Sequence, residues 1–402
     1  MLPFDILEYQ KRLKETKKRM ADKGIEVLLV TDPANMNYLS GYDAWSFYVH
    51  QMLIIIDEEP QPIWIGRYLD ANGAKETTWI YEENVIPYPD YYVQSTTLHP
   101  MDFIGDILTE IGHGNRSIGV EMDNYYFSAK AYERLKTKLP NATFKDGDLL
   151  VNYVRLIKSD QEIEYMKRAA KIAEQAMYKG IESIQAGNRE CDTAAQIYYH
   201  MLSGTEEYGG DYPAIVPLLP SGERTSIPHL TWTDRKFQEG DAVIIELAGC
   251  YKRYHVPIAR TVTIGNPSDR LQQITPIVVD GINEVLHQTK PGMTCGEVER
   301  IWRESIKKRG YEKEARLGYS IGLNYPPDWG EHTASLRKDD DTVLKPNMTF
   351  HFIPALWFDN YGIEISESFR ITENGCETFT NYPRDLIIQP PFRMNKQGGK
   401  IS

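Results

Sequence analysis

The stretch ELAGCYKRYHVPIART, residues 246–261, holds an apolar run, a polar interruption and a second apolar run that ends in Arg-Thr. This pattern predicts two strands joined by a turn. Helix-like and strand-like segments surround this hairpin in the order helix, helix, hairpin, helix, helix, strands: roughly 160–185, 190–204, 246–261, 269–288, 295–309, 347–353 and 363–371. The repeated order predicts an α+β domain with an antiparallel sheet.

The first part of the chain has a different pattern, in which strand-like and helix-like segments alternate. Alternation of this kind predicts an α/β domain with a parallel or mixed sheet. Ser159 and Asp160 are candidate caps of a long amphipathic helix that follows it. We therefore expect an α/β domain at 1–155, an α+β domain at 156–390, and a mobile tail at 391–402, where Pro, Gly and basic residues show no periodicity.

Composition narrows the functional classes. The formal net charge of -12 argues against a surface that binds nucleic acid or an anionic membrane. No apolar run reaches the ~18 residues of a membrane helix, and the charged N-terminus does not have the pattern of a signal peptide. The four cysteines, Cys191, Cys250, Cys295 and Cys376, lie far apart. Their spacing fits a reducing cytoplasm and predicts neither a disulfide framework nor a zinc knuckle.

Several motifs resemble those of one known family. The runs KSDQEIEYMKRAA, EGD, ART, KPGMTCGEVER, GYSIGL and LKPNMTF occur in the order found in the pita-bread family of methionine aminopeptidase, prolidase and creatinase. The resemblance covers almost the whole chain. It implies a creatinase-like α/β N-terminal domain followed by an α+β pita-bread catalytic domain.

Metal-dependent members of that family hold two ions with Asp, Asp, His, Glu and Glu. The resemblance carries these ligands onto Glu246, Pro257, Tyr319, Ile353 and Ser366, or Glu367 if the last is shifted by one position. A divalent ion needs several convergent donor atoms. The sequence therefore predicts that the chain holds no metal, and no organic cofactor is implied.

Five longer runs resemble a metal-free branch of the family, the members that hydrolyse ectoine: TDPANMNYLSGYDAWSFYVHQ, VPLLPSGERTSIPHLTW, ELAGCYKRYHVPIART, GLNYPPDWGEHTASLR and MTFHFIPALWFDNYGIEISES. This likeness implies hydrolysis of a C–N bond in a cyclic amidine. The implied substrate is a small zwitterion, ectoine or hydroxyectoine, and the implied product is N-acetyl-2,4-diaminobutyrate. Creatinase fits less well, because the glutamate that it carries before Arg-Thr is Ala259 here.

Two residues are the catalytic candidates. His229 lies seventeen positions before Glu246, a spacing that places a histidine in the active cleft of the relatives. An imidazole that titrates near neutral pH suits proton transfer. Glu246 closes the apolar run AVIIELAG, and a carboxylate there can act as a base, a counter-ion or a covalent nucleophile.

Further residues are candidates for binding the substrate. We expect Tyr254 and His255 in the hairpin turn, and Glu331 and His332 in a segment lining the cleft. Tyr319 replaces a metal-binding histidine. His351 shares a strand face with Ile353, and only one of Glu364 and Glu367 can share a face with Ser366; Glu364 is the candidate.

Trp45 and Tyr48 belong to an aromatic loop, YDAWSFYVHQ. In the family the equivalent loop reaches toward the cleft of a partner subunit, which implies a homodimer with a shared active site. Aromatic walls would favour a cationic substrate.

Three other functions remain open at this point. The chain could hydrolyse another amidine or guanidine, as creatinase does. It could be a metal-free pita-bread domain that binds peptides or proteins, which the retention of His229, Glu246 and Glu331 argues against. It could be an Xaa-Pro peptidase with unusual ligands, which Pro257 and Ile353 argue against.

Overall fold

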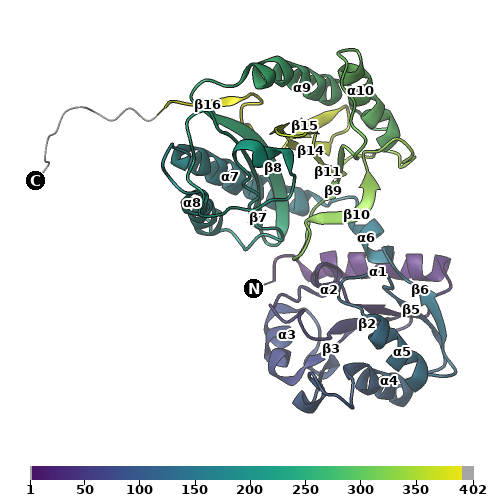
Figure 1. The fold of residues 1–402 in the computed structure, drawn as a ribbon. Coiled ribbons are helices and arrows are strands. Elements are labelled where there is room, and N and C mark those ends of the chain that lie inside the picture. Colours follow the sequence, from purple (N-terminus) through teal and green to yellow (C-terminus); the bar gives the residue numbers. More distant parts are fainter. Residues whose placement is uncertain (1, 392–402) are drawn as a thin grey trace, which may run out of the picture. The chain divides into compact units, whose positions relative to one another are not determined.

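The computed structural model describes residues 2–391. The chain forms two compact units that divide between Arg155 and Leu156 (Figure 1). Residues 392–402, which make up most of the expected tail, lie outside the described residues.

The first unit is an α/β domain, as expected. Its elements are α1 Ile6–Asp22, β1 Val27–Val30, α2 Pro33–Ser40, β2 Met52–Ile56, β3 Ile63–Arg67, α3 Ala71–Thr77, β4 Val85–Tyr88, α4 Pro100–Glu110, β5 Ser117–Val120, α5 Ala129–Lys138, β6 Thr143–Asp146 and α6 Leu150–Arg155. The strands form one mixed sheet in the order β4-β3-β2-β1-β5-β6. Strand β1 runs antiparallel to β2 and parallel to β5.

Helices α4 and α5 cover one face of this sheet, and α1 lies along the other (Figure 1). Alternate residues of a strand point to the same face. Val27 and Leu29 of β1 accordingly share a core cluster with Ile104 of α4 and Leu135 of α5.

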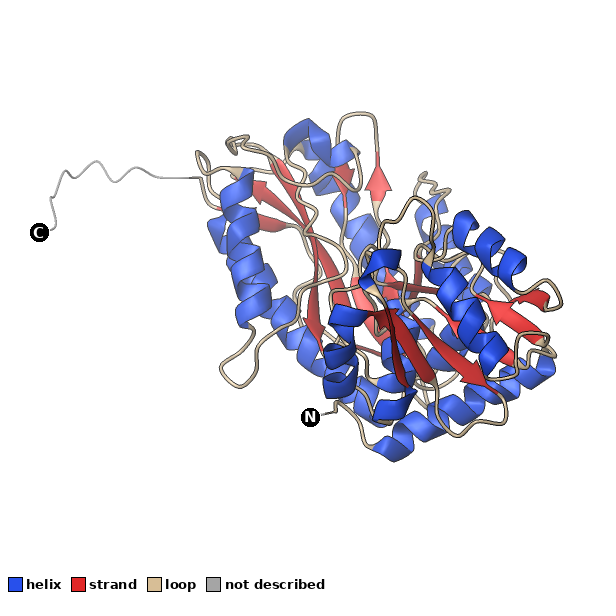
Figure 2. Cartoon of the chain, turned by 90° about the horizontal axis from the view of Figure 1, so that it is seen from below, coloured by secondary structure: helices blue, strands red, loops and turns tan. Residues whose placement is uncertain are grey.

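Over its described residues, 156–391, the second unit contains two helix pairs and three sheets. Its elements are α7 Asp160–Ser183, α8 Glu190–Ser203, β7 Ala242–Tyr251, β8 Tyr254–Ile264, α9 Asp269–Gln288, α10 Cys295–Lys307, β9 Gly318–Ile321, β10 Gly330–Ser335, β11 Thr349–Phe352, β12 Leu356–Trp357, β13 Gly362–Ile363, β14 Glu367–Ile371, β15 Cys376–Thr378 and β16 Ile387–Gln389. The sheets have the orders β10-β9-β11-β14-β15, β12-β13 and β16-β8-β7. Within each unit the helices lie along the faces of the sheets (Figure 2).

Helix α7 begins at the predicted cap. The Ser159 side chain accepts a hydrogen bond from the Glu162 backbone, and the Glu162 side chain accepts one from the Ser159 backbone, which completes a capping box. The helix then packs on strand β7 at Gly249. A Cβ at this position would lie 1.9 Å from the Ala169 carbonyl oxygen, so only glycine permits the close approach.

The predicted hairpin is the β7–β8 pair, and its register is regular from Ala242↔Thr263 to Tyr251↔Tyr254. Its turn consists of Lys252 and Arg253, with φ angles of 51° and 67°. Two successive residues at positive φ match the twist of the flanking strands. Tyr254 and His255, expected in the turn, therefore belong to β8 instead.

The two faces of β7 differ in character. Val243, Ile245 and Leu247 belong to a core cluster that includes residues of α7 and α8. Glu246 lies between two of them in sequence and so points to the opposite face. In the C-terminal half of the same unit, Val278 of α9 and Trp302 of α10 share a second core cluster with Phe350 of β11. Each helix pair thus covers one sheet, in line with the repeated order in the sequence.

Candidate functional site

A cavity of about 630 Å³ lies in the second unit. This volume falls in the range of small-molecule sites. Its walls combine apolar, aromatic and charged side chains: Ile215, Val216, Leu218, Pro228, His229, Thr231, Glu246, Lys313, Ala315, Arg316, Gly318, Tyr319, Trp329, Ile353, Trp357 and Glu364. Both catalytic candidates, His229 and Glu246, are among them.

Glu246 enters the cavity from strand β7. Its backbone is fixed by two hydrogen bonds with Leu218, of 2.9 and 3.0 Å, and its side chain is buried. Burial raises the pKa of Glu246 well above its usual range, and the neighbouring charges of Glu364 and Asp328 raise it further. A cation placed beside Glu246 would reverse this effect and favour the carboxylate.

Glu364 supplies a second buried carboxyl group. It lies directly after β13, where its backbone nitrogen donates to the Thr261 hydroxyl at 2.8 Å and its carbonyl oxygen accepts from the same hydroxyl at 2.9 Å. Thr261 belongs to β8, so one residue of the hairpin fixes the segment that carries Glu364. Burial raises the pKa of Glu364 to about 7, against an opposing effect of Lys313.

His229 lies in an exposed loop that follows a 3₁₀ turn, η4 Gly222–Ser226. Its φ angle is 67°, in the left-handed region that non-glycine residues rarely occupy. The loop is anchored beside His229 by a hydrogen bond of 3.1 Å from the Leu219 nitrogen to the Leu230 carbonyl. A left-handed residue is a common feature of functional sites, where the surroundings hold the strained backbone.

Tyr319 lies on β9 and lines the cavity, as expected from its place in the sequence. Its hydroxyl accepts a hydrogen bond of 2.8 Å from the Trp329 indole and lies 3.3 Å from Nδ1 of His351. Burial raises the pKa of Tyr319 well above its usual range, and the charge of Glu246 adds to this effect. The phenol is therefore a neutral hydrogen-bonding group at neutral pH.

His351 lies behind this wall and is not itself a lining residue. Its Nε2 is 2.8 Å from the Ser366 hydroxyl, and its ring is fully buried. Burial lowers the pKa of His351 to about 3, with a further contribution from Arg316. The neutral imidazole positions Tyr319.

Two basic residues of the cavity, Lys313 and Arg316, were not singled out in the sequence. They belong to the run KKRGYEKEARLG, whose mixed charges are typical of a solvated surface. The structure instead buries Lys313 and brings both residues to the wall shared with Trp357 and Tyr319. Their position at the cavity follows only from the three-dimensional structure.

Tyr254 and His255 do not line the cavity. The Tyr254 hydroxyl donates to the Glu162 carboxylate at 2.8 Å, so this side chain faces α7. His255 accepts a hydrogen bond of 2.9 Å from the Ala214 backbone, and burial lowers its pKa to about 3. The structure gives both residues contacts within the protein in place of the expected contacts with substrate.

Glu331 and His332 are also outside the set of lining residues. Glu331 forms a buried ion pair with Lys158, with 2.7 Å between the carboxylate and the ammonium group. The side chain of His332 is 45% exposed, and its Nε2 lies 2.8 Å from the Asp328 carboxylate. The expectation that this segment lines the cleft holds for Trp329 but not for these two residues.

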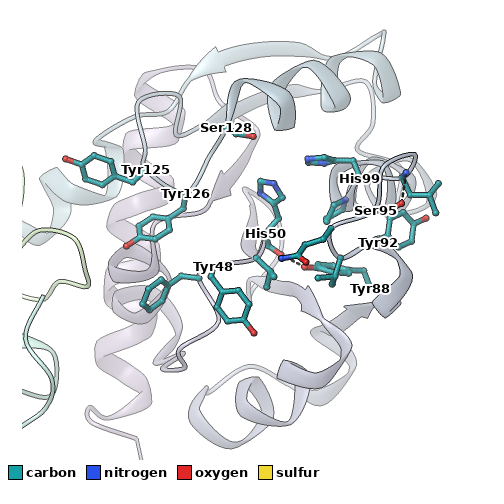
Figure 3. Close-up of a pocket in the computed structure, with 15 residues that line it drawn as sticks. Tyr48, His50, Tyr88, Tyr92, Ser95, His99, Tyr125, Tyr126 and Ser128 are labelled. Atoms are coloured by element: carbon teal, nitrogen blue, oxygen red, sulfur yellow. Dashed lines mark hydrogen bonds between the residues drawn. The ribbon is translucent and has the colours of Figure 1, made fainter.

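Trp45 and Tyr48 lie in the first unit, where both side chains are exposed. The Trp45 ring contacts Phe47 with 4.7 Å between the centroids. Tyr48 borders a separate cavity of about 350 Å³, together with His50, Tyr88, Tyr92 and Tyr126 (Figure 3).

The donor atoms of the cavity do not fit a two-metal site. Pro257 shares the face of the hairpin that carries Glu246 but offers no donor, and Ile353 is apolar. Ser366 is engaged by His351 and by the Ala259 nitrogen, at 2.8 and 2.7 Å. Among residues 2–391 no group of three or more His, Cys, Asp or Glu side chains is arranged to hold a metal ion.

Two family models match the chain: the creatinase/prolidase N-terminal domain over residues 12–157, and metallopeptidase family M24 over residues 164–373. An ectoine hydrolase of Halomonas elongata is 46% identical over 395 residues, which cover 96% of this chain and 99% of that relative. An uncharacterized hydrolase/peptidase of Sinorhizobium fredii is 45% identical over 389 residues, which cover 97% and 99%.

Among solved structures, a prolidase from Pyrococcus horikoshii superimposes with a TM-score of 0.79 and 27% sequence identity. The match covers 94% of this chain and 100% of the prolidase. In the part of the chain that the structure describes, no helix has the length and apolar character to cross a membrane.

Proposed function

The chain belongs to metallopeptidase family M24 and carries the creatinase/prolidase N-terminal domain, and from this premise we propose that it is a hydrolase opening the cyclic amidine ring of ectoine or hydroxyectoine. The product from ectoine is N-acetyl-2,4-diaminobutyrate. The proposal is supported by the 46% identity with the Halomonas elongata ectoine hydrolase over nearly the full length of both chains.

One observation carries the proposal. Two buried carboxyl groups, Glu246 and Glu364, line a cavity that also has aromatic walls at Trp329 and Trp357. Buried carboxyl groups whose pKa values are raised by burial are suited to a cationic ligand. A protonated amidine supplies this charge, and its flat ring suits aromatic walls.

In the proposed reaction Glu246 acts on the amidinium carbon. As a nucleophile, its carboxylate oxygen bonds to this carbon, His229 donates a proton to one ring nitrogen, and the bond from that nitrogen to the carbon breaks. Water then attacks the same carbon and gives a proton back to His229, and the bond to Glu246 breaks, which releases the carboxylate and leaves the acetamide of the product. As a base, Glu246 would instead take the proton of the attacking water. Both routes consume one water and need no metal, which is part of the proposal.

The proposed working unit is a homodimer, in which the Trp45 and Tyr48 loop of one subunit closes the cavity of the other. This part rests on the family resemblance and on the exposure of the two aromatic side chains. We also propose that the substrate is a free small molecule in the cytoplasm.

The decisive experiment is turnover of a substrate panel by the purified protein, followed by NMR. The panel contains ectoine, hydroxyectoine, creatine and an Xaa-Pro dipeptide, each with and without EDTA. We expect conversion of ectoine or hydroxyectoine to the acetylated diamine, unaffected by EDTA. Conversion of creatine or of the dipeptide alone would replace the proposal with one of the other hydrolase functions. An inactive protein that still binds peptides would point to a binding domain.

Mass spectrometry of acid-quenched enzyme distinguishes the route in which Glu246 is a nucleophile from the route in which it is a base. A mass spectrum of wild-type protein mixed with ectoine should contain an adduct on the peptide carrying Glu246 if the carboxylate is a nucleophile. The Glu246→Gln variant is the matched control. Absence of an adduct under rapid quenching, with activity intact, would favour the role as a base.

A further inference from the structure

The cavity contains positive as well as negative side chains, and the two kinds come from different segments. The carboxyl groups are Glu246 on β7 and Glu364 after β13. The cations are Lys313 and Arg316, which lie in the segment between α10 and β9. All four side chains line the same cavity.

Lys313 is a buried cation with defined hydrogen bonds. Its ammonium group donates to the carbonyl oxygens of Ile353 and Ala355, at 3.0 and 2.8 Å, and lies 4.6 Å from the centroid of the Trp357 ring. An ammonium group has three N–H donors, so these two bonds leave one donor for a ligand. Burial lowers the pKa of Lys313 to about 8, and the charge of Glu364 opposes this effect.

Lys313 is not occupied by a direct ion pair. Among the described residues, no carboxylate forms an ion pair with its ammonium group, whose hydrogen-bond partners are the two carbonyl oxygens. Glu364 influences it only at longer range. A buried cation whose neighbours are carbonyl oxygens and an indole ring is costly to keep without an anion.

Arg316 lies at the same cavity and is the more exposed of the two cations. Its guanidinium carbon lies 4.5 Å from the centroid of the Tyr319 ring, and one nitrogen donates to the Ser335 hydroxyl at 3.3 Å. Stacking on the phenol holds the planar group at the cavity wall, where several of its five N–H donors remain for a ligand. Arginine binds carboxylates with paired hydrogen bonds.

We propose that Lys313 and Arg316 form a carboxylate-binding subsite, called here the basic wall, which selects substrates that carry an anionic group beside the cationic amidine. This inference rests on the proposed function for the identity of the amidine, but the subsite itself follows from the two cations. Glu246 and Glu364 bind the positive end of the substrate, and the basic wall binds its carboxylate. A neutral or purely cationic amidine then lacks half of the binding contacts.

The test measures binding of cyclohexanecarboxylate, a ring with a carboxylate and no amidine, by calorimetry and by inhibition of ectoine turnover. We expect competitive inhibition of the wild-type protein. Arg316→Gln and Lys313→Gln should each weaken binding about 10- to 100-fold, the range for a charge-assisted hydrogen bond. Lys307→Gln, an exposed substitution on the neighbouring helix α10, is the matched control and should leave binding unchanged.

A second arm compares ectoine with the same cyclic amidine lacking its carboxylate. The wild-type protein should prefer ectoine in kcat/KM by 10-fold or more, and Arg316→Gln should remove most of this preference by raising KM for ectoine alone. Arg316 is exposed, so this variant should fold even if Lys313→Gln does not.

The outcomes separate the two proposals. If cyclohexanecarboxylate does not bind, or if it binds equally well to Arg316→Gln and Lys307→Gln, the proposal of the basic wall is wrong. This holds whether or not ectoine is a substrate. Binding that depends on Arg316 in a protein that leaves ectoine intact upholds the basic wall and overturns the proposed reaction.

Discussion

Glu246 and Glu364 come from different sheets of the second unit and meet in one cavity, where the charge of Glu364 helps to raise the pKa of Glu246. Burial therefore disfavours the charged form of both carboxyl groups. The pKa of Glu364 is raised to about 7 by burial. Its ionisation falls within the physiological range, which gives the first prediction.

We expect kcat/KM for ectoine to rise with pH between pH 5 and pH 8. Below the raised pKa, Glu364 is protonated and loses the charge that attracts the amidinium group, so kcat/KM should fall by about tenfold per pH unit on the acid side. The measurement is a pH–rate profile of the wild-type protein and of Glu364→Gln, in which this limb should move or disappear. A flat wild-type profile between pH 5 and pH 7 contradicts the assignment.

The second prediction concerns the catalytic pair. Glu246→Gln keeps the shape of the side chain but removes its charge and nucleophilicity, and should lower kcat for ectoine by roughly 10³-fold or more. His229→Asn should cost about 10²–10⁴-fold, because proton transfer is lost. The double variant should be little worse than the poorer single variant, since both residues serve one mechanism.

The controls use the local structure. Asparagine tolerates the left-handed backbone of His229, so His229→Asn tests the imidazole without adding strain. The variant Glu239→Gln changes an exposed glutamate before β7 and should keep full activity. Ectoine turnover within threefold of wild type for Glu246→Gln would refute the role of Glu246 and shift attention to Glu364.

Chelation gives the third prediction. Dialysis against EDTA should leave turnover unchanged, because Pro257 and Ile353 provide no ligand atoms at positions that metal-dependent relatives use. Metal content is checked by elemental analysis of the same samples. Loss of activity on dialysis, with recovery on adding manganese or cobalt, would show that the cavity uses a metal after all.

The fourth prediction concerns the aromatic loop. Trp45→Ala should raise KM for ectoine several-fold while leaving the Tm unchanged, since the side chain is 57% exposed. Sedimentation of the wild-type protein should show a dimer at assay concentration. A fully active monomer, or an unchanged KM in Trp45→Ala, would mean that the loop does not reach the site of another subunit.

The fifth prediction links the cavity to stability. The folded-state pKa of Glu364 is about 7, above its ordinary 4.5, so its contribution to stability is present below pH 4.5 and is lost as the pH rises through 7. At pH 8, Glu364→Gln should therefore raise the free energy of unfolding by about 1–3 kcal/mol. Urea unfolding at pH 5 and pH 8 tests this: the difference between variant and wild type should be larger at pH 8.

Sequence patterns predicted the parts of the site that depend on local periodicity. Alternation within a strand separated Glu364 from Glu367. In the structure Glu364 lines the cavity, whereas Glu367 lies 2.6 Å from Arg260 in a buried ion pair. The cap at Ser159 was predicted for the same reason, because capping depends on neighbouring residues.

The errors all involve contacts between distant segments or turns without a typical sequence. The turn at Lys252 and Arg253 lacks the Asn-Gly or Asp-Gly signal of its type, so the turn was placed too late. Glu331 meets Lys158 across 173 positions, which no local pattern reveals. Lys313 is buried only because separate strands enclose it, and its sequence neighbours are polar.

The two-residue turn of the hairpin has a consequence for how the site can change. Strand register alternates side chains between faces, so inserting or deleting one residue in β7 between the turn and Glu246 would replace Glu246 at the cavity by Leu247 or by Ile245. The carboxylate would then be buried against α7 and α8. Length changes are thus forbidden in this segment of the chain, while substitutions on the cavity face leave the packing of the helices untouched. A new substrate specificity can therefore arise by substitution of single cavity-facing side chains while the backbone of the hairpin stays unchanged.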